Sequence, residues 1–135
     1  MATILAHITV RPGSESDFEA ISRDLYETSH ESETGLLRYE YWRGSEPGSY
    51  YTLLSFVDFA SFIAHQTSDH HEEASPKLGQ VLTGIRLEWI DPVDGAAPLP
   101  RTEAQDLSAA ADELTRRYAE RFAARVAPWW QTVRN

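Results

Sequence analysis

The sequence predicts a single α+β domain with the ferredoxin-like order βαββαβ, in which a four-stranded antiparallel sheet carries both helices on one side. Between residues 3 and 90, segments of strand and helix periodicity alternate in this order. The two middle strands flank residues 45–49, a turn of hairpin length that contains Pro47 and Gly48. Both faces of the strands carry large apolar side chains, so we expect a homodimer in which a second copy covers the open face.

The first half of the chain should contain one helix. Ser14 is expected to begin it and Gly35 to end it. Its apolar stripe consists of Phe18, Ile21 and Leu25, and its outer face is acidic. The four strands, recognised by alternation, are residues 3–10, 36–43, 50–57 and 85–90.

Residues 58–71 are predicted to form a short helix, a break and the start of a second helix. Asp58 can cap the first helix, because apolar side chains follow it at helical spacing. Ser68 or Asp69 can cap the second, which runs from His70 towards Leu82. Pro76 is expected to interrupt this second helix or to force a fresh start.

The last 40 residues are predicted to be an appendage to the domain of residues 1–95. Residues 96–103 are a linker with two prolines, and residues 104–135 form a helical extension. A long helix is expected over residues 104–130, with an apolar stripe that docks onto the body or the partner. The stripe includes Leu114, Tyr118, Phe122 and Trp129. A helix lying on a membrane surface is the alternative interpretation.

Composition limits the function classes. The chain has 135 residues, 41% of them hydrophobic, which suffices for one domain with its own core. Residues 1–95 hold 6 Lys and Arg against 16 Asp and Glu, and so acidic a body repels nucleic acid. Neither a membrane-spanning run nor a signal peptide is recognised. The lack of Cys excludes disulfides and fits the cytoplasm.

Five histidines are the main candidates for chemistry. His65, His70 and His71 lie within seven residues of each other, and the helix break decides their geometry. They are read either as surface residues on a polar turn or as groups facing a pocket, with His65 in hydrogen bonding or proton transfer. No metal site is predicted, because Cys is absent and no His pair has i, i+4 spacing. His7 and His30 are interpreted as structural.

Several short motifs, in order, resemble the antibiotic biosynthesis monooxygenase superfamily of dimeric α+β barrels. They cover residues 3–91 and exclude the C-terminal extension. The matching motifs are Val10-Arg11-Pro12-Gly13 followed by Phe18, Glu33-Thr34-Gly35-Leu36-Leu37-Arg38-Tyr39-Glu40, Ser55-Phe56 leading to Asp58, then His65, Ser68 and Leu78 to Leu82.

The resemblance implies a monooxygenase that uses no flavin, haem or metal and acts on a quinol or aromatic polyketide. The resemblance implies that His65 or His7 is the catalytic base. The expected substrate-binding residues are Tyr39, Trp42, Phe56, Phe62, His70 and Arg86. An aromatic-ligand binder or polyketide cyclase that consumes no O2 is the alternative, since fold alone cannot decide. Haem binding through His7, His70 or His71 is a third possible function.

Overall fold

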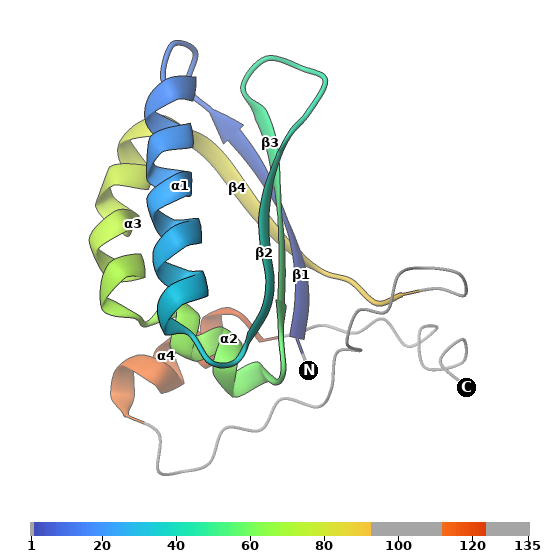
Figure 1. The fold of residues 1–135 in the computed structure, drawn as a ribbon, viewed down its shortest axis with the longest axis vertical. Coiled ribbons are helices and arrows are strands. Elements are labelled where there is room, and N and C mark those ends of the chain that lie inside the picture. Colours follow the sequence, from blue (N-terminus) through green and yellow to red (C-terminus); the bar gives the residue numbers. More distant parts are fainter. Residues whose placement is uncertain (1, 93–111, 124–135) are drawn as a thin grey trace.

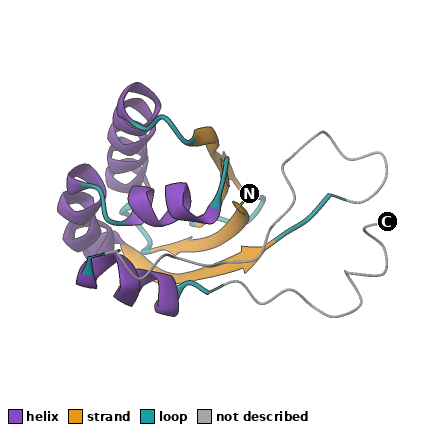
Figure 2. Cartoon of the chain, turned by 90° about the horizontal axis from the view of Figure 1, so that it is seen from below, coloured by secondary structure: helices purple, strands orange, loops and turns teal. Residues whose placement is uncertain are grey.

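The chain folds into an antiparallel sheet with helices on one face (Figure 1). The computed structural model describes residues 2–92 and 112–123. The strands are β1 (Ala2–Val10), β2 (Leu36–Arg43), β3 (Ser49–Phe56) and β4 (Leu82–Trp89). The helices are α1 (Glu15–Ser32), α2 (Phe59–Gln66), α3 (Asp69–Val81) and α4 (Glu113–Arg121). Figure 2 shows most of the helical structure on one side of the strands. None of the described helices is long and apolar enough to cross a membrane.

The strand order β2-β3-β1-β4, with every neighbouring pair antiparallel, confirms the predicted ferredoxin-like sheet. The register places His7 of β1 opposite Tyr51 on β3 and Arg86 on β4. The last strand begins three residues earlier than expected, directly after α3, because Leu82 already pairs with Val10. No loop therefore separates α3 from β4.

The predicted break between α2 and α3 is confirmed. Asp58 caps α2 by accepting a hydrogen bond from the backbone N–H of Ser61 at 2.7 Å. Ser68 caps α3, since its hydroxyl accepts from the N–H of His71 at 3.3 Å. These two caps satisfy backbone donors that a helix leaves free, and they fix where each helix begins.

Helix α3 runs unbroken through Pro76, so the expected interruption there is wrong. Proline inside a helix removes one backbone hydrogen bond and crowds the preceding turn, at a cost of roughly 3 kcal/mol. Ala74, in the turn before Pro76, and Val81, at the end of the helix, are both buried. Their packing against the body holds the helix together across the proline.

The two faces of the sheet have different surroundings. The side chains of Ile4 and Ile8 on β1 and of Leu54 on β3 point to the helices and are buried. Side chains on the opposite face, here called the open face, are mostly half-buried or exposed, although Thr3 and Ser55 at one end of it are fully buried. The others include Leu5, His7, Trp42, Tyr51, Leu53, Arg86 and Glu88.

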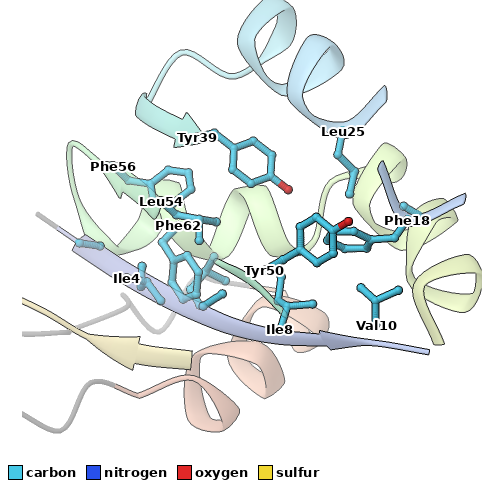
Figure 3. Close-up of a cluster of buried hydrophobic side chains, with 14 of the residues drawn as sticks. Ile4, Ile8, Val10, Phe18, Leu25, Tyr39, Tyr50, Leu54, Phe56 and Phe62 are labelled. Carbon is cyan, nitrogen blue, oxygen red and sulfur yellow. The ribbon is translucent and has the colours of Figure 1, made fainter. Parts of the chain in front are cut away.

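The core lies between the sheet and the helices, where side chains from both layers fill the space (Figure 3). Its largest fully buried apolar members are Phe18, Phe56, Phe62, Ile4 and Ile63. The ring of Phe62 packs against Phe56 and against Trp89, with centroids 5.7 and 5.4 Å apart. This aromatic cluster anchors α2 to the sheet.

Helix α4 is the described part of the C-terminal extension. Asp112 caps it by accepting from the N–H of Thr115 at 2.8 Å, so the helix begins at Glu113. Tyr118 and Phe122 are partly buried against the core, and the ring of Phe122 lies 5.9 Å from Phe62. One continuous helix over 104–130 is therefore wrong within the described residues, because α4 ends at Arg121 with Phe122 as its C-cap. The rest of that range, with Trp129, lies mostly outside the described residues.

Replacing Phe62 by Ala should lower the free energy of unfolding by about 3 to 5 kcal/mol, because it leaves a cavity in the aromatic cluster. The measurement is urea denaturation followed by circular dichroism. Leu37→Ala is the matched control, since Leu37 is 48% exposed and should change stability by less than about 1 kcal/mol. Equal losses in the two variants would contradict the assignment of Phe62 to the core.

Candidate active site

Three helix ends meet at one carboxylate. Glu33 is the C-cap residue of α1, His65 lies in the last turn of α2, and His70 lies in the first turn of α3. The His65 ring nitrogen Nδ1 lies 3.0 Å from each carboxylate oxygen of Glu33. Nε2 of His70 lies 2.9 Å from Oε1 of the same carboxylate. The break between α2 and α3 brings both histidines to Glu33.

The His65 side chain is fully buried, and aromatic and imidazole rings pack around it. Its ring centroid lies 4.9 Å from that of Tyr39 and 5.2 Å from that of Phe56. His71 packs edge-on against it, also at 4.9 Å. Because Nδ1 is held by Glu33, Nε2 is the nitrogen left for other chemistry, and it has no hydrogen-bond partner among residues 2–92 and 112–123.

The charges of this cluster are set by burial and by the histidines. Burial acts to raise the pKa of the Glu33 carboxyl, but the hydrogen bond and charge of His65 and the bond from His70 outweigh it, so the pKa is lowered. Glu33 is therefore a carboxylate at neutral pH. Burial also lowers the pKa of His71 from 6.5 to about 3, with His65 and His70 adding to the effect.

An interior cavity of about 60 Å³ lies between the sheet and the helices. His65 and His71 line it together with Tyr39, Tyr41 and aliphatic side chains of α3 and β4. The hydroxyls of Tyr39 and Tyr41 hydrogen bond to each other. Burial raises the pKa of both tyrosines, so both stay protonated and can donate hydrogen bonds. Figure 3 shows Tyr39 reaching into this interior.

A larger groove of about 470 Å³ lies on the outside, between α1 and β2. Phe18 and Tyr41 line both the groove and the interior cavity, so these two side chains separate the two spaces. At the rim, Arg43 pairs with Glu19 at 2.7 Å, and hydrogen bonds from Arg43 and Tyr50 lower the pKa of Glu19 to about 2. Tyr26 and Trp42 add exposed aromatic surface to the groove.

The sequence-predicted residues do not all fall in one site. His65 and Tyr39 line the cavity, and Trp42 lines the outer groove. Phe56 and Phe62 are fully buried packing residues that line neither space, although Phe56 contacts the His65 ring. The ring nitrogen of His70 contacts the carboxylate of Glu33, which also contacts His65.

His7 and Arg86 are separated from this site. Both lie on the open face, where His7 Nε2 contacts Glu88 at 2.8 Å and Arg86 contacts the same carboxylate at 3.2 Å. The helix-facing residues of β1 lie between His7 and the cavity. His7 and His65 therefore do not form one site within the chain.

Sequence reasoning missed the roles of Glu33, Tyr41 and His71. Tyr41 had a signal, because it follows Tyr39 by two residues on a strand and so shares its face. Glu33 had none, since a residue at a helix C-cap has no periodicity that reveals what it faces. The sequence left His71 either on the surface or facing a pocket, and the structure packs it on His65.

The sequence profile described as antibiotic biosynthesis monooxygenase matches residues 1–77, more than half of the chain. Among curated proteins, none matches the chain. Two further similarities come from solved structures, and they share the fold. A protein of Pseudomonas aeruginosa is 24% identical, with a TM-score of 0.62, over 67% of this chain and 92% of its own. One of Mycobacterium tuberculosis is 18% identical, with a TM-score of 0.64, over 71% and 98%.

A third solved structure, from Caulobacter crescentus, is of a protein provisionally named an antibiotic biosynthesis monooxygenase. It is 26% identical to this chain, with a TM-score of 0.64, and the match covers 68% of this chain and 89% of the other. All three matches leave about a third of this chain uncovered.

The lowered pKa of His71 should make the protein less stable as the pH falls from about 6.5 to about 3. In this window the unfolded state binds a proton at His71 that the folded state does not, so protons favour unfolding. We expect His71→Leu to flatten the slope of unfolding free energy between pH 6 and pH 4, measured by urea denaturation. His30→Leu, at an exposed site, should leave the slope unchanged. A steep slope in both variants would contradict the assignment.

Proposed function

Since the chain belongs to the antibiotic biosynthesis monooxygenase family, we propose that it is a monooxygenase that oxidises a quinol or aromatic polyketide-like substrate without an organic cofactor. One observation carries this proposal: a buried histidine whose Nδ1 is held by a carboxylate and whose Nε2 is unpartnered within the described chain, beside an aromatic-lined cavity.

In this proposal His65 is the general base. Glu33 holds the proton on Nδ1, which leaves the lone pair of Nε2 free to accept a proton from the substrate. The imidazolium that forms is stabilised by the negative charge of Glu33 at 3.0 Å. Tyr39 and Tyr41 remain protonated, and since one hydroxyl already donates to the other, the second can donate a hydrogen bond to the oxygen of the substrate anion.

The substrate itself supplies the electrons. Removing a proton from the reacting carbon of an anthrone, or from a quinol hydroxyl, gives an electron-rich anion that can reduce O2. For an anthrone, the carbon takes up O2 and a proton to give a hydroperoxide. Loss of water leaves the carbonyl, so one oxygen atom enters the product and the other leaves in water. The chain contributes proton transfer and binding.

Size indicates how the substrate is held. A cavity of about 60 Å³ is smaller than the roughly 150 Å³ that accommodates benzene, whereas about 470 Å³ is typical of ligand sites. We propose that the aromatic body of the substrate occupies the outer groove. Its reacting edge reaches His65 when the side chains of Phe18 or Tyr41, which line both spaces, move aside.

A binder or cyclase that uses no O2 is the second candidate. The observation in its favour is the pair of protonated hydroxyls of Tyr39 and Tyr41, which suits a substrate carbonyl. With His65 as base, the hydroxyl that is left free to donate would promote enolisation and ring closure. The two candidates differ in whether oxygen is consumed.

We also propose that the open face is covered by a second copy of the chain. Trp42 and Tyr51 are 55% and 37% exposed there, beside the aliphatic side chains of Leu5 and Leu53. A sheet face with this much apolar surface is seldom left to solvent. The ion pairs of His7 and Arg86 with Glu88, which lies opposite Leu5, would then lie on the covered face.

The base assignment can be tested with His65→Gln, which we expect to lower the turnover of a quinol or anthrone about 10²- to 10⁴-fold. Glu33→Gln should lower it less, because the base remains but loses its fixed tautomer and charge partner. Oxygen uptake measured with an electrode, with product identified by mass spectrometry, gives the rate. His30→Gln and Glu31→Gln are matched exposed controls and should retain wild-type turnover.

Retained turnover in His65→Gln would remove the base from the helix site, and loss in His7→Gln alone would move it to the open face. Tight binding of the aromatic compounds without oxygen uptake by the wild type would favour the binder or cyclase.

The dimer can be tested with Leu53→Glu, which places a charge in the middle of the open face. Sedimentation velocity at about 10 µM should give a dimer for the wild type and a monomer for the variant, because an unpaired buried charge is costly. Glu73→Leu, on the exposed side of α3, should remain a dimer. A wild-type monomer would contradict the proposal.

A further inference from the structure

The ligand atoms of Glu33, His65 and His70 converge on one point at the junction of α1, α2 and α3. A carboxylate oxygen, Nδ1 of His65 and Nε2 of His70 all lie within 4.8 Å of one another. We propose that this cluster binds one divalent transition-metal ion of the Zn²⁺ or Fe²⁺ type. The proposal concerns the outer side of His65, away from the nitrogen assigned as base, and does not depend on the proposed oxidation.

The spacing of the donor atoms fits shared coordination. Ligands about 2.1 Å from an octahedral ion lie about 3.0 Å apart when adjacent and about 4.2 Å when opposite, and those around a tetrahedral ion such as Zn²⁺ lie about 3.4 Å apart. The carboxylate of Glu33 lies 3.0 Å from the His65 nitrogen and 2.9 Å from the His70 nitrogen. Since the full spread is at most 4.8 Å, a small rotation of the partly exposed His70 brings all three into range.

The surroundings of His70 support a cation at this point. Its Nε2 lies within 3.2 Å of three oxygens, those of Glu33, Ser29 and Ser68. A single ring nitrogen can satisfy only one of them with its proton or lone pair. An ion among these oxygens would use several of them at once, and the serine hydroxyls or water would complete the coordination shell.

The electric fields of two helix ends also favour a cation at the cluster. The C-terminal ends of α1 and α2 both lie at the cluster, and the partial negative charge of a helix C-terminus favours a cation. The N-terminus of α3 opposes it, but Asp69 and Glu72 in its first turn are acidic. Two imidazoles with one carboxylate suit Zn²⁺, Fe²⁺ or Co²⁺, whereas Mg²⁺ and Ca²⁺ prefer all-oxygen sites.

An ion at this place would also change His65. Coordination through Nδ1 leaves the ring proton on Nε2, so the nitrogen facing the cavity becomes a donor and ceases to be a base. On the assumption of the proposed oxidation, the metal-free chain is the active form and bound metal suppresses turnover. This consequence rests on the proposed function; the binding site does not.

Binding can be measured directly by titrating ZnCl2 into tag-free full-length protein in a calorimeter, with Co²⁺ absorption as a second probe. We expect one ion per chain and at least a hundredfold weaker binding in Glu33→Gln and in His70→Asn, because each removes a ligand. Glu31→Gln and His30→Asn, exposed neighbours on α1, should bind as the wild type does. Thermal unfolding shows whether each variant is folded.

Absence of saturable binding up to millimolar Zn²⁺ would overturn the proposal, as would binding unaffected by both ligand variants. Because calorimetry reads binding without a substrate, a failure here leaves the oxidation proposal intact, and a chain without oxidase activity can still bind the ion.

Discussion

The carboxylate of Glu33, shared by two histidines, is the interaction on which the site depends. Helix α1 must end at Glu33 for its side chain to face the other helices, and α2 must break at Thr67 so that His65 and His70 approach from two directions. A continuous helix would point these histidines apart. Caps at Asp58 and Ser68, which determine where α2 and α3 begin, therefore also determine the chemistry.

The fold was predictable because its signals are local and repeated. Alternation in four segments and an apolar stripe such as that of Phe18 and Leu25 fix which side chains are buried, and a one-residue shift would expose them. The prediction failed where tertiary packing overrode local preference. Pro76 costs α3 a hydrogen bond, yet burial of the residues around it keeps the helix continuous.

The site was predictable only in part, and the reason is physical. Tyr39 and His65 could be assigned to the helix side of the sheet from period and spacing, and the structure places them together. The same alternation puts His7 on the other face, but ranking it as a base required knowing what lies between the faces. The role of Glu33 could not be predicted, because contacts between helix ends depend on the whole fold and leave no periodic pattern in the sequence.

The same three side chains can hold a proton or a metal ion, and the balance depends on the charge of one carboxylate. Without metal, Glu33 keeps the proton on Nδ1 of His65 and leaves Nε2 basic. With an ion between them, the carboxylate no longer accepts that proton, and the ring is fixed in the opposite tautomer. Burial strengthens both arrangements, since the His65 side chain is fully shielded from water. Metal binding at this single cluster would thus determine whether His65 can act as a base in the cavity.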